Sequence, residues 1–184
     1  MSRRLTAADR SALIRLASAM PVGSEERRAI LAGLTSPSRT AAGDVNVPGR
    51  HILDNAVVSQ NARVIDSAEV YGDAEVYGDA EVSGRAEVFD DAQVYGDARV
   101  TGSVQVFGRA VVSGRAVVSG RAWVAGDALV TGRARVFDMA KVSGDALVTS
   151  DARIGGSAII LGGKWDGSEG EITSGRWKAP GVPA

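Results

Sequence analysis

The 184-residue chain has no cysteine, one histidine and few aromatic residues, which make up 5 % of it. Without cysteine, disulfide bonds and thiolate metal sites are excluded within the chain. No hydrophobic run approaches the roughly 20 residues of a membrane-spanning helix. The opening residues, MSRRLTAADR, lack the apolar core of a secretory signal. We therefore expect no membrane span, no export by a cleaved signal peptide, and a cytoplasmic location.

In place of large apolar residues, the chain has valine, alanine and glycine in a fixed order. From Ala56 onward it reads A-x-V-x-G-x, and Val or Ile recurs every six residues from Val58 to Ile160, over 18 hexads. In an extended segment Ala and the Val two residues later point to one side, and the residue between them points outward. Each hexad therefore predicts a very short strand and a glycine corner. Such strands are stable only if the hexads coil and stack.

The positions of the aromatic residues indicate how many hexads make one coil. Tyr71, Phe89 and Phe107 are 18 residues apart, and so are Tyr77 and Tyr95. Three hexads per coil would stack these rings in two columns, whereas coils of 12 or 24 residues would separate them. We therefore predict a triangular prism of about six 18-residue coils, filled by Val and Ala.

The A-x-V-x-G-x pattern, from Ala56 to Ile160, resembles the hexapeptide repeat of left-handed parallel β-helix proteins. It is most similar to a subgroup from bacterial and phage genomes, whose members are often named only as transferases. The pattern departs from the family in one respect, because glycine usually stands one residue later than the family's Gly, Asp or Glu. The resemblance implies an all-β, left-handed parallel β-helix, here over residues 51–162, and a homotrimer.

The two ends of the chain follow different patterns. Residues 1–34 have the apolar spacing of two short helices, and residues 35–50 read as a Ser-, Pro- and Gly-rich linker. Such a helical hairpin lacks a core of its own, so it should dock on its own copies, on a partner protein or on the first coil. We predict that 163–184 form a C-terminal cap or tail. The residues expected to be buried by these contacts are Leu13, Ile14, Ile30, Leu31 and Leu34 in the hairpin, and Trp165, Ile172 and Trp177 in the cap.

The N-terminal 50 residues carry a net charge of +4, with eight Arg against four acidic residues. They have no aromatic residue for stacking on bases and no clustered basic run. This pattern favours solvated helix faces and argues against nucleic-acid binding.

The outward position between Ala and Val changes character along the chain. One column runs from Glu75 and Gln93 to three apolar residues, while a second column holds Val117 and the third holds Trp123. An apolar patch on a rigid face usually marks a contact surface. We predict a subunit interface at Val111, Val117, Trp123, Leu129 and Leu147.

Residues suited to catalysis or metal binding are few. Enzymes of the resembled family include acyltransferases that use acyl-coenzyme A and a catalytic His, and zinc enzymes with several His ligands. This chain has only His51, and its hexads from 58 to 160 have no inserted loop to form a cleft. His51 would be the base of an acyltransferase, but an ordinary surface role is favoured. We predict no cofactor and no metal site.

One column of corner acids, Asp73, Asp91, Asp127 and Asp145, is interrupted by Arg109. Calcium binds several oxygen ligands, and such a column could supply them, although solvated turn charges are favoured.

Together these patterns predict a non-enzymatic structural or assembly protein. By the resemblance, it would belong to a phage particle or a bacterial assembly. The alternative is a hexapeptide acyltransferase-like enzyme, or a degenerate relative of one.

Overall fold

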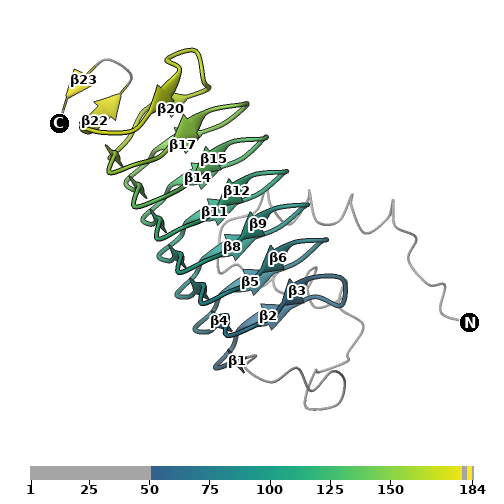
Figure 1. The fold of residues 1–184 in the computed structure, drawn as a ribbon. Helices are drawn as coiled ribbons and strands as arrows, with labels where there is room; N and C mark the ends of the chain where they lie inside the picture. Colours follow the sequence, from purple (N-terminus) through teal and green to yellow (C-terminus); the bar gives the residue numbers. More distant parts are fainter. Residues whose placement is uncertain (1–50, 180–181, 184) are drawn as a thin grey trace, which may run out of the picture. The chain divides into compact units, whose positions relative to one another are not determined.

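In the computed structural model, which describes residues 51–179 and 182–183, the chain winds through three sheets in turn. Figure 1 shows the coils stacked along one axis, from β1 at one end to β22 at the other. Every strand pair is parallel except the last, β22 with β23. The described residues contain no helix. The predicted all-β parallel β-helix is confirmed.

The strands are two residues long, apart from β22 with four. The first sheet, sheet A, contains β1 (His51–Ile52), β4 (Glu69–Val70), β7 (Glu87–Val88), β10 (Gln105–Val106), β13 (Trp123–Val124), β16 (Lys141–Val142), β19 (Ile159–Ile160), β22 (Arg176–Ala179) and β23 (Val182–Pro183). Sheet B contains β2 (Val57–Val58), β5 (Glu75–Val76), β8 (Gln93–Val94), β11 (Val111–Val112), β14 (Leu129–Val130), β17 (Leu147–Val148) and β20 (Lys164–Trp165). Sheet C contains β3 (Arg63–Val64), β6 (Glu81–Val82), β9 (Arg99–Val100), β12 (Val117–Val118), β15 (Arg135–Val136), β18 (Arg153–Ile154) and β21 (Glu171–Ile172).

We call each set of three consecutive strands a coil, so that β1–β3 form coil 1 and β19–β21 form coil 7. The described chain therefore has seven coils, one more than predicted. The count was low because it began at Val58, which left out β1, and because it ended at Ile160, where the six-residue spacing ends. Beyond it the chain still pairs, with Val148 opposite Trp165, Ile154 opposite Ile172 and Ile160 opposite Trp177.

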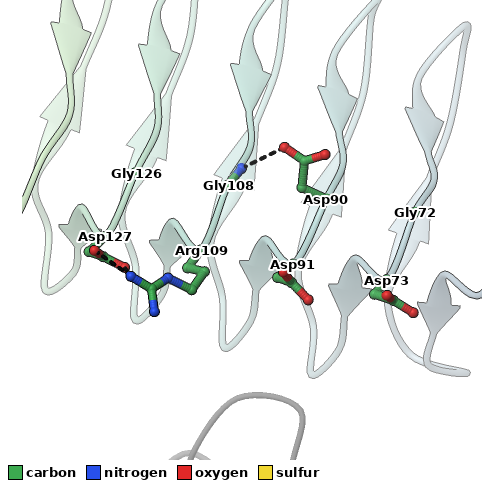
Figure 2. Close-up of a pocket in the computed structure, with 8 residues that line it drawn as sticks. All are labelled: Gly72, Asp73, Asp90, Asp91, Gly108, Arg109, Gly126 and Asp127. Atoms are coloured by element: carbon green, nitrogen blue, oxygen red, sulfur yellow. Dashed lines mark hydrogen bonds and ion pairs between the residues drawn. The ribbon is translucent and has the colours of Figure 1, made fainter.

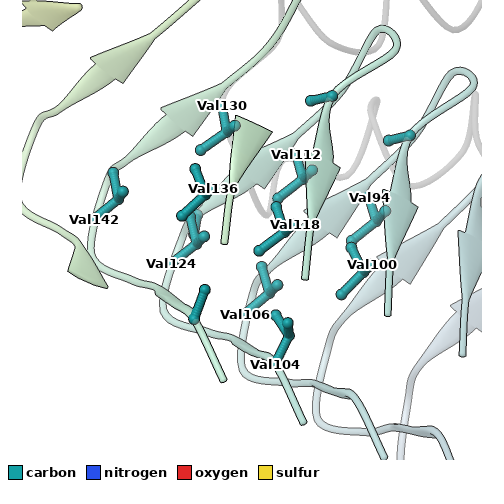
Figure 3. Packing of buried hydrophobic residues seen from close by; sticks show 14 of the residues in the cluster. Val94, Val100, Val104, Val106, Val112, Val118, Val124, Val130, Val136 and Val142 are labelled. Atoms are coloured by element: carbon teal, nitrogen blue, oxygen red, sulfur yellow. The ribbon is translucent and has the colours of Figure 1, made fainter. Parts of the chain in front are cut away.

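The core is a narrow column of Val and Ala side chains that runs inside the prism (Figure 3). Val112 and its neighbours in the column are completely buried, as are the Ala residues two positions before them. The outward residue of each strand stays at least partly exposed in nearly every coil. The alternation predicted from the A-x-V pattern is therefore confirmed.

Hydrogen bonds join the coils along the corners as well as along the strands. In the second coil, the backbone N–H groups of Glu69, Tyr71 and Asp73 donate to carbonyls of the third coil at 2.8–3.0 Å. These bonds pair residues 17 apart, and the side chains of residues 18 apart stand above one another. The rings of Tyr71 and Phe89 stack at 5.0 Å, and those of Tyr77 and Tyr95 at 4.9 Å. The 18-residue coil is confirmed.

The corners require a left-handed backbone conformation at one residue. Gly120, for example, has φ +77°, and a Cβ placed there would lie 2.8–2.9 Å from backbone atoms of Asp138 in the next coil. Glycine is therefore needed there for two reasons: its φ and the close approach of the next coil.

The C-terminal end of the stack is covered by two tryptophans. Trp165 is buried, and its indole N–H donates to the Gly162 carbonyl at 2.8 Å. Trp177 packs edge-on against it at 6.4 Å, and Ile172 also contacts the core. All three residues lie in strands that continue the sheets, so the parallel pairing extends past residue 162.

Candidate interaction surfaces

The apolar column predicted on one face lies in sheet B. Val111, Leu129 and Leu147 are direct neighbours on β11, β14 and β17, and all three are partly exposed. The corner next to them carries Ser113 and Thr131, whose hydroxyl groups are hydrogen-bonded at 3.0 Å. Over coils 4 to 6, sheet B is therefore a flat, uncharged surface, and we call these three apolar residues the sheet B stripe.

The other two predicted interface residues lie on different faces. Trp123 is on sheet A, is 41 % exposed and contacts the Phe107 ring edge-on at 6.4 Å. The Lys141 ammonium group lies 4.1 Å from the centre of the Trp123 ring. Val117 is on sheet C, between Arg99 and Arg135. The fold therefore joins only three of the five residues into one surface.

The corners between sheets A and B line an open groove of about 580 Å³. Figure 2 shows the Asp73 and Asp91 carboxylates projecting from these corners, while Arg109 reaches to Asp127. The Arg109–Asp127 pair is 2.7 Å apart. The groove is also lined by Gly72, Gly108 and Gly126 of coils 2, 4 and 5, and coil 3 has Asp90 at the same position. Within the described residues, no group of three acidic or His side chains is arranged to hold a metal ion.

Some corners have aspartate instead of glycine at the left-handed position. Asp90 has φ +59°, and its carboxylate accepts a hydrogen bond from the Gly108 backbone N–H, 18 residues later, at 3.1 Å. Asp54, Asp66 and Asp138 make the same bond to the glycine of the following coil. This role was not predicted from the sequence, although an aspartate 18 residues before a glycine is a visible signal.

Replacing Asp90 with alanine should lower the free energy of unfolding by about 1–2 kcal/mol, because it removes this hydrogen bond and leaves a Cβ residue at positive φ. Asp90→Gly loses the same bond but relieves the backbone, so it should cost less. Urea titration of the two variants compares them directly. Equal losses would show that the left-handed backbone conformation costs nothing with a side chain there, and no loss in Asp90→Gly would show that the carboxylate hydrogen bond contributes nothing.

The ion pairs of the arginines all run in one direction along the stack, from the arginine to an acid in the following coil. Each Arg that has an acidic residue 18 positions later forms an ion pair with it, as Arg133 does with Asp151 at 2.9 Å. Arg109 pairs with Asp127 in the following coil, although Asp91 lies one coil before it. The remaining pairs are Arg63–Glu81 and Arg153–Glu171.

Sheet C carries arginines that this rule leaves unpaired. Arg99 is followed 18 residues later by Val117, and Arg135 by Arg153. Within the described part of the chain, Arg99 and Arg135 make no ion pair, and both are exposed. We call Arg99, Val117 and Arg135, with Arg153 next to them, the sheet C arginine column.

The surroundings of two ionisable groups shift their pKa values. Burial raises the pKa of the Tyr71 phenol above its usual value, and the negative charges of Glu87 and Glu69 raise it further. The pKa of Asp166 is lowered because its carboxylate accepts hydrogen bonds from Ser168. Both effects come from local packing, and neither group lies in the groove or the sheet B stripe.

The remaining predicted site residue is His51, at the start of β1, where its backbone pairs with Glu69. Its side chain lies outside the described atoms. The same holds for Leu13, Ile14, Ile30, Leu31 and Leu34, because residues 1–50 lie outside the described range. In the part of the chain that is described, no helix has the length and hydrophobicity to cross a membrane.

Comparison with protein families agrees with this geometry. Residues 92–106, from just before β8 to the end of β10, match the family model described as the YdcK β-solenoid repeat. The chain contains a hexapeptide-repeat-like β-helix. Comparisons with curated proteins and with solved structures gave no match. The family match covers less than one coil of the β-helix, so it identifies the repeat and leaves the function open.

Proposed function

We propose that this β-helix is a non-enzymatic structural module that assembles with its own copies through the sheet B stripe. The observation that carries the proposal is the run of Val111, Leu129 and Leu147 on three successive strands. At the same coils, sheets A and C each carry a single apolar residue, Trp123 or Val117, among charged or polar ones such as Lys141 and Arg135. Apolar side chains that stay in contact with water do not stabilise the protein, whereas the same side chains stabilise a complex when they are buried at its interface.

The surroundings of the stripe also support a contact surface. Its edges carry Asp127 and Asp145 on one corner and Arg115 and Arg133 on the other, all of them exposed. An apolar centre with a charged rim is the usual anatomy of a protein interface. The proposed assembly is a homotrimer, since the resemblance implies one. The N-terminal helices predicted from the sequence would dock it to a protein partner in a phage particle or a bacterial assembly.

The double variant Leu129→Asp with Leu147→Asp should dissociate the assembly and leave the coils folded. Two carboxylates placed in an apolar interface must be desolvated, so the association constant should fall by about a hundredfold or more. Light scattering coupled to size-exclusion chromatography measures the mass, and circular dichroism measures the fold. Thr101→Asp with Ser103→Asp, at exposed positions away from the stripe, adds the same charge and should leave the mass unchanged.

An unchanged mass in the stripe variant, or a monomeric wild type, would refute the proposal. The acyltransferase alternative makes a separate prediction. Acetyl-coenzyme A should raise the melting temperature of the wild type, and His51→Ala should abolish that shift. The structural module should show no shift with the ligand.

A further inference from the structure

We propose a second contact between copies of this chain, in which the sheet C arginine column of one copy enters the groove between sheets A and B of the next. The two surfaces lie on opposite sides of the triangular prism, because sheet C faces away from the A–B corner. Arg99 and Arg135 lack an acidic partner within the described residues. The groove offers exposed carboxylates.

The charged residues on the two surfaces have the same spacing along the stack. Those on sheet C and those along the groove both recur once per coil, so two parallel copies can place them opposite one another. Copies that lie side by side at equal height bring equal coils together. In coil 3, Arg99 then faces Asp91, and in coil 5, Arg135 faces Asp127. In coil 6, Arg153 faces Asp145.

Both rows of charges are interrupted in coil 4, and in coil 2 sheet C also carries Glu81, which at equal height faces Asp73 of the groove. Coil 4 is where the groove has Arg109 instead of aspartate, and it is also where sheet C has Val117 instead of arginine. At equal height these two residues face each other, and no arginine meets Arg109. A shift by one coil in one direction brings Arg99 opposite Arg109, and a shift in the other direction brings Arg135 opposite it. The charge pattern therefore selects one register.

The groove also suits the shape and chemistry of an arginine side chain. Its lining includes Gly72, Gly108 and Gly126, which have no side chain to fill it. A planar guanidinium group matches a carboxylate with paired hydrogen bonds. Inside one chain, the Nη2 atom of Arg109 already lies 2.7 Å from both carboxylate oxygens of Asp127. The remaining lone pairs of those oxygens can accept Arg135 of a second copy.

Since the two surfaces lie on opposite sides of the prism, the contact repeats without closing into a ring. A contact between different patches whose rotation does not close generates an open row. The contact should also be weak and sensitive to salt, because exposed charges are screened over about 8 Å at physiological ionic strength. Its arginines lie on sheet C, away from the sheet B stripe, while its groove shares Asp127 with the rim of that stripe. The contact would join the assemblies formed through the stripe into larger ones.

The test is a charge exchange, followed by sedimentation velocity of the full chain in about 20 mM and about 300 mM salt. At low salt the wild type should form species larger than the basic oligomer, and high salt should dissolve them. Arg99→Glu with Arg135→Glu should weaken this association at least tenfold. Asp91→Arg with Asp127→Arg should do the same. An equimolar mixture of the two variants should restore it, since each altered surface then finds its complement.

Two controls make the result specific. Arg85→Glu with Arg121→Glu changes the charge equally at exposed corner positions outside sheet C, and should leave the association intact. Mixing the sheet C variant with Asp73→Arg and Asp145→Arg should fail to restore it, because these positions do not face Arg99 and Arg135. A wild type without salt-sensitive larger species, or a mixture that stays dissociated, would overturn the inference. The Leu129→Asp, Leu147→Asp variant reports separately on the sheet B stripe.

Discussion

Val112→Phe should lower the free energy of unfolding by about 2–3 kcal/mol, and the melting temperature by about 5–10 °C. Val112 is completely buried in a column whose other members are Val and Ala. A phenyl ring exceeds the space of one Val, and the hydrogen bonds between coils prevent the sheets from moving apart. The strain must therefore be taken by displaced backbone or by lost coil-to-coil bonds. Differential scanning calorimetry measures the change.

Val57→Phe is the matched control for this substitution. Val57 occupies the outward position of its strand and is 40 % exposed. The same change in side-chain volume should therefore have little effect on stability there. If both variants melt at the wild-type temperature, Val112 does not lie in a closed core.

Gly120→Ala should be strongly damaging for a single-methyl change, with a loss of about 3 kcal/mol or more. The added Cβ would lie 2.8 Å from both the backbone N and O of Asp138. At this corner Arg121 N–H donates to the Asp138 carbonyl at 2.6 Å, and Ser103 N–H donates to the Gly120 carbonyl at 2.7 Å. A methyl group between these coils must break or stretch such bonds in the middle of the stack.

Gly170→Ala separates the two causes of that loss. Gly170 has φ +78°, almost the same as the +77° of Gly120, but a Cβ there would meet nothing within 4 Å. Its substitution should therefore cost only the backbone strain, about 1 kcal/mol. Chemical denaturation of the two variants gives the difference, which measures the clash between coils. Equal losses would show that conformation alone requires glycine at the corners.

Much of the fold could be predicted because a strict repeat converts sequence distance into spatial distance. Residues 18 apart must lie above one another, so the Tyr71–Phe89 stack and the sheet B stripe were both predictable from the sequence. The repeat also predicted which residues point inward, since strand side chains alternate. The prediction stopped at Ile160 because the final coil pairs residues at spacings of 17, 18 and 17, which a search for strict hexads does not follow.

The candidate surfaces were only partly predictable. Val117 and Trp123 were predicted to share one interface with Leu129, although the 18-residue period already placed the three in different columns. In the structure these two residues lie on other sheets. The column of corner acids could be predicted from the sequence, but which of these acids pairs with Arg109 could not. Whether Arg109 pairs with the acid one coil before it or one coil after it depends on the direction of the side chain.

By itself, the sequence determined the coil length, the composition of the core and the columns of the outward residues, because these follow from a period and from strand alternation. Within the described residues, the tertiary structure alone decided which columns form a surface, which arginines remain unpaired and how the tryptophans pack at the C-terminal end of the stack. It also revealed that Asp90 supports the next coil through a backbone hydrogen bond. These features depend on backbone conformation at the corners and on side-chain direction, and a regular repeat of residue types specifies neither.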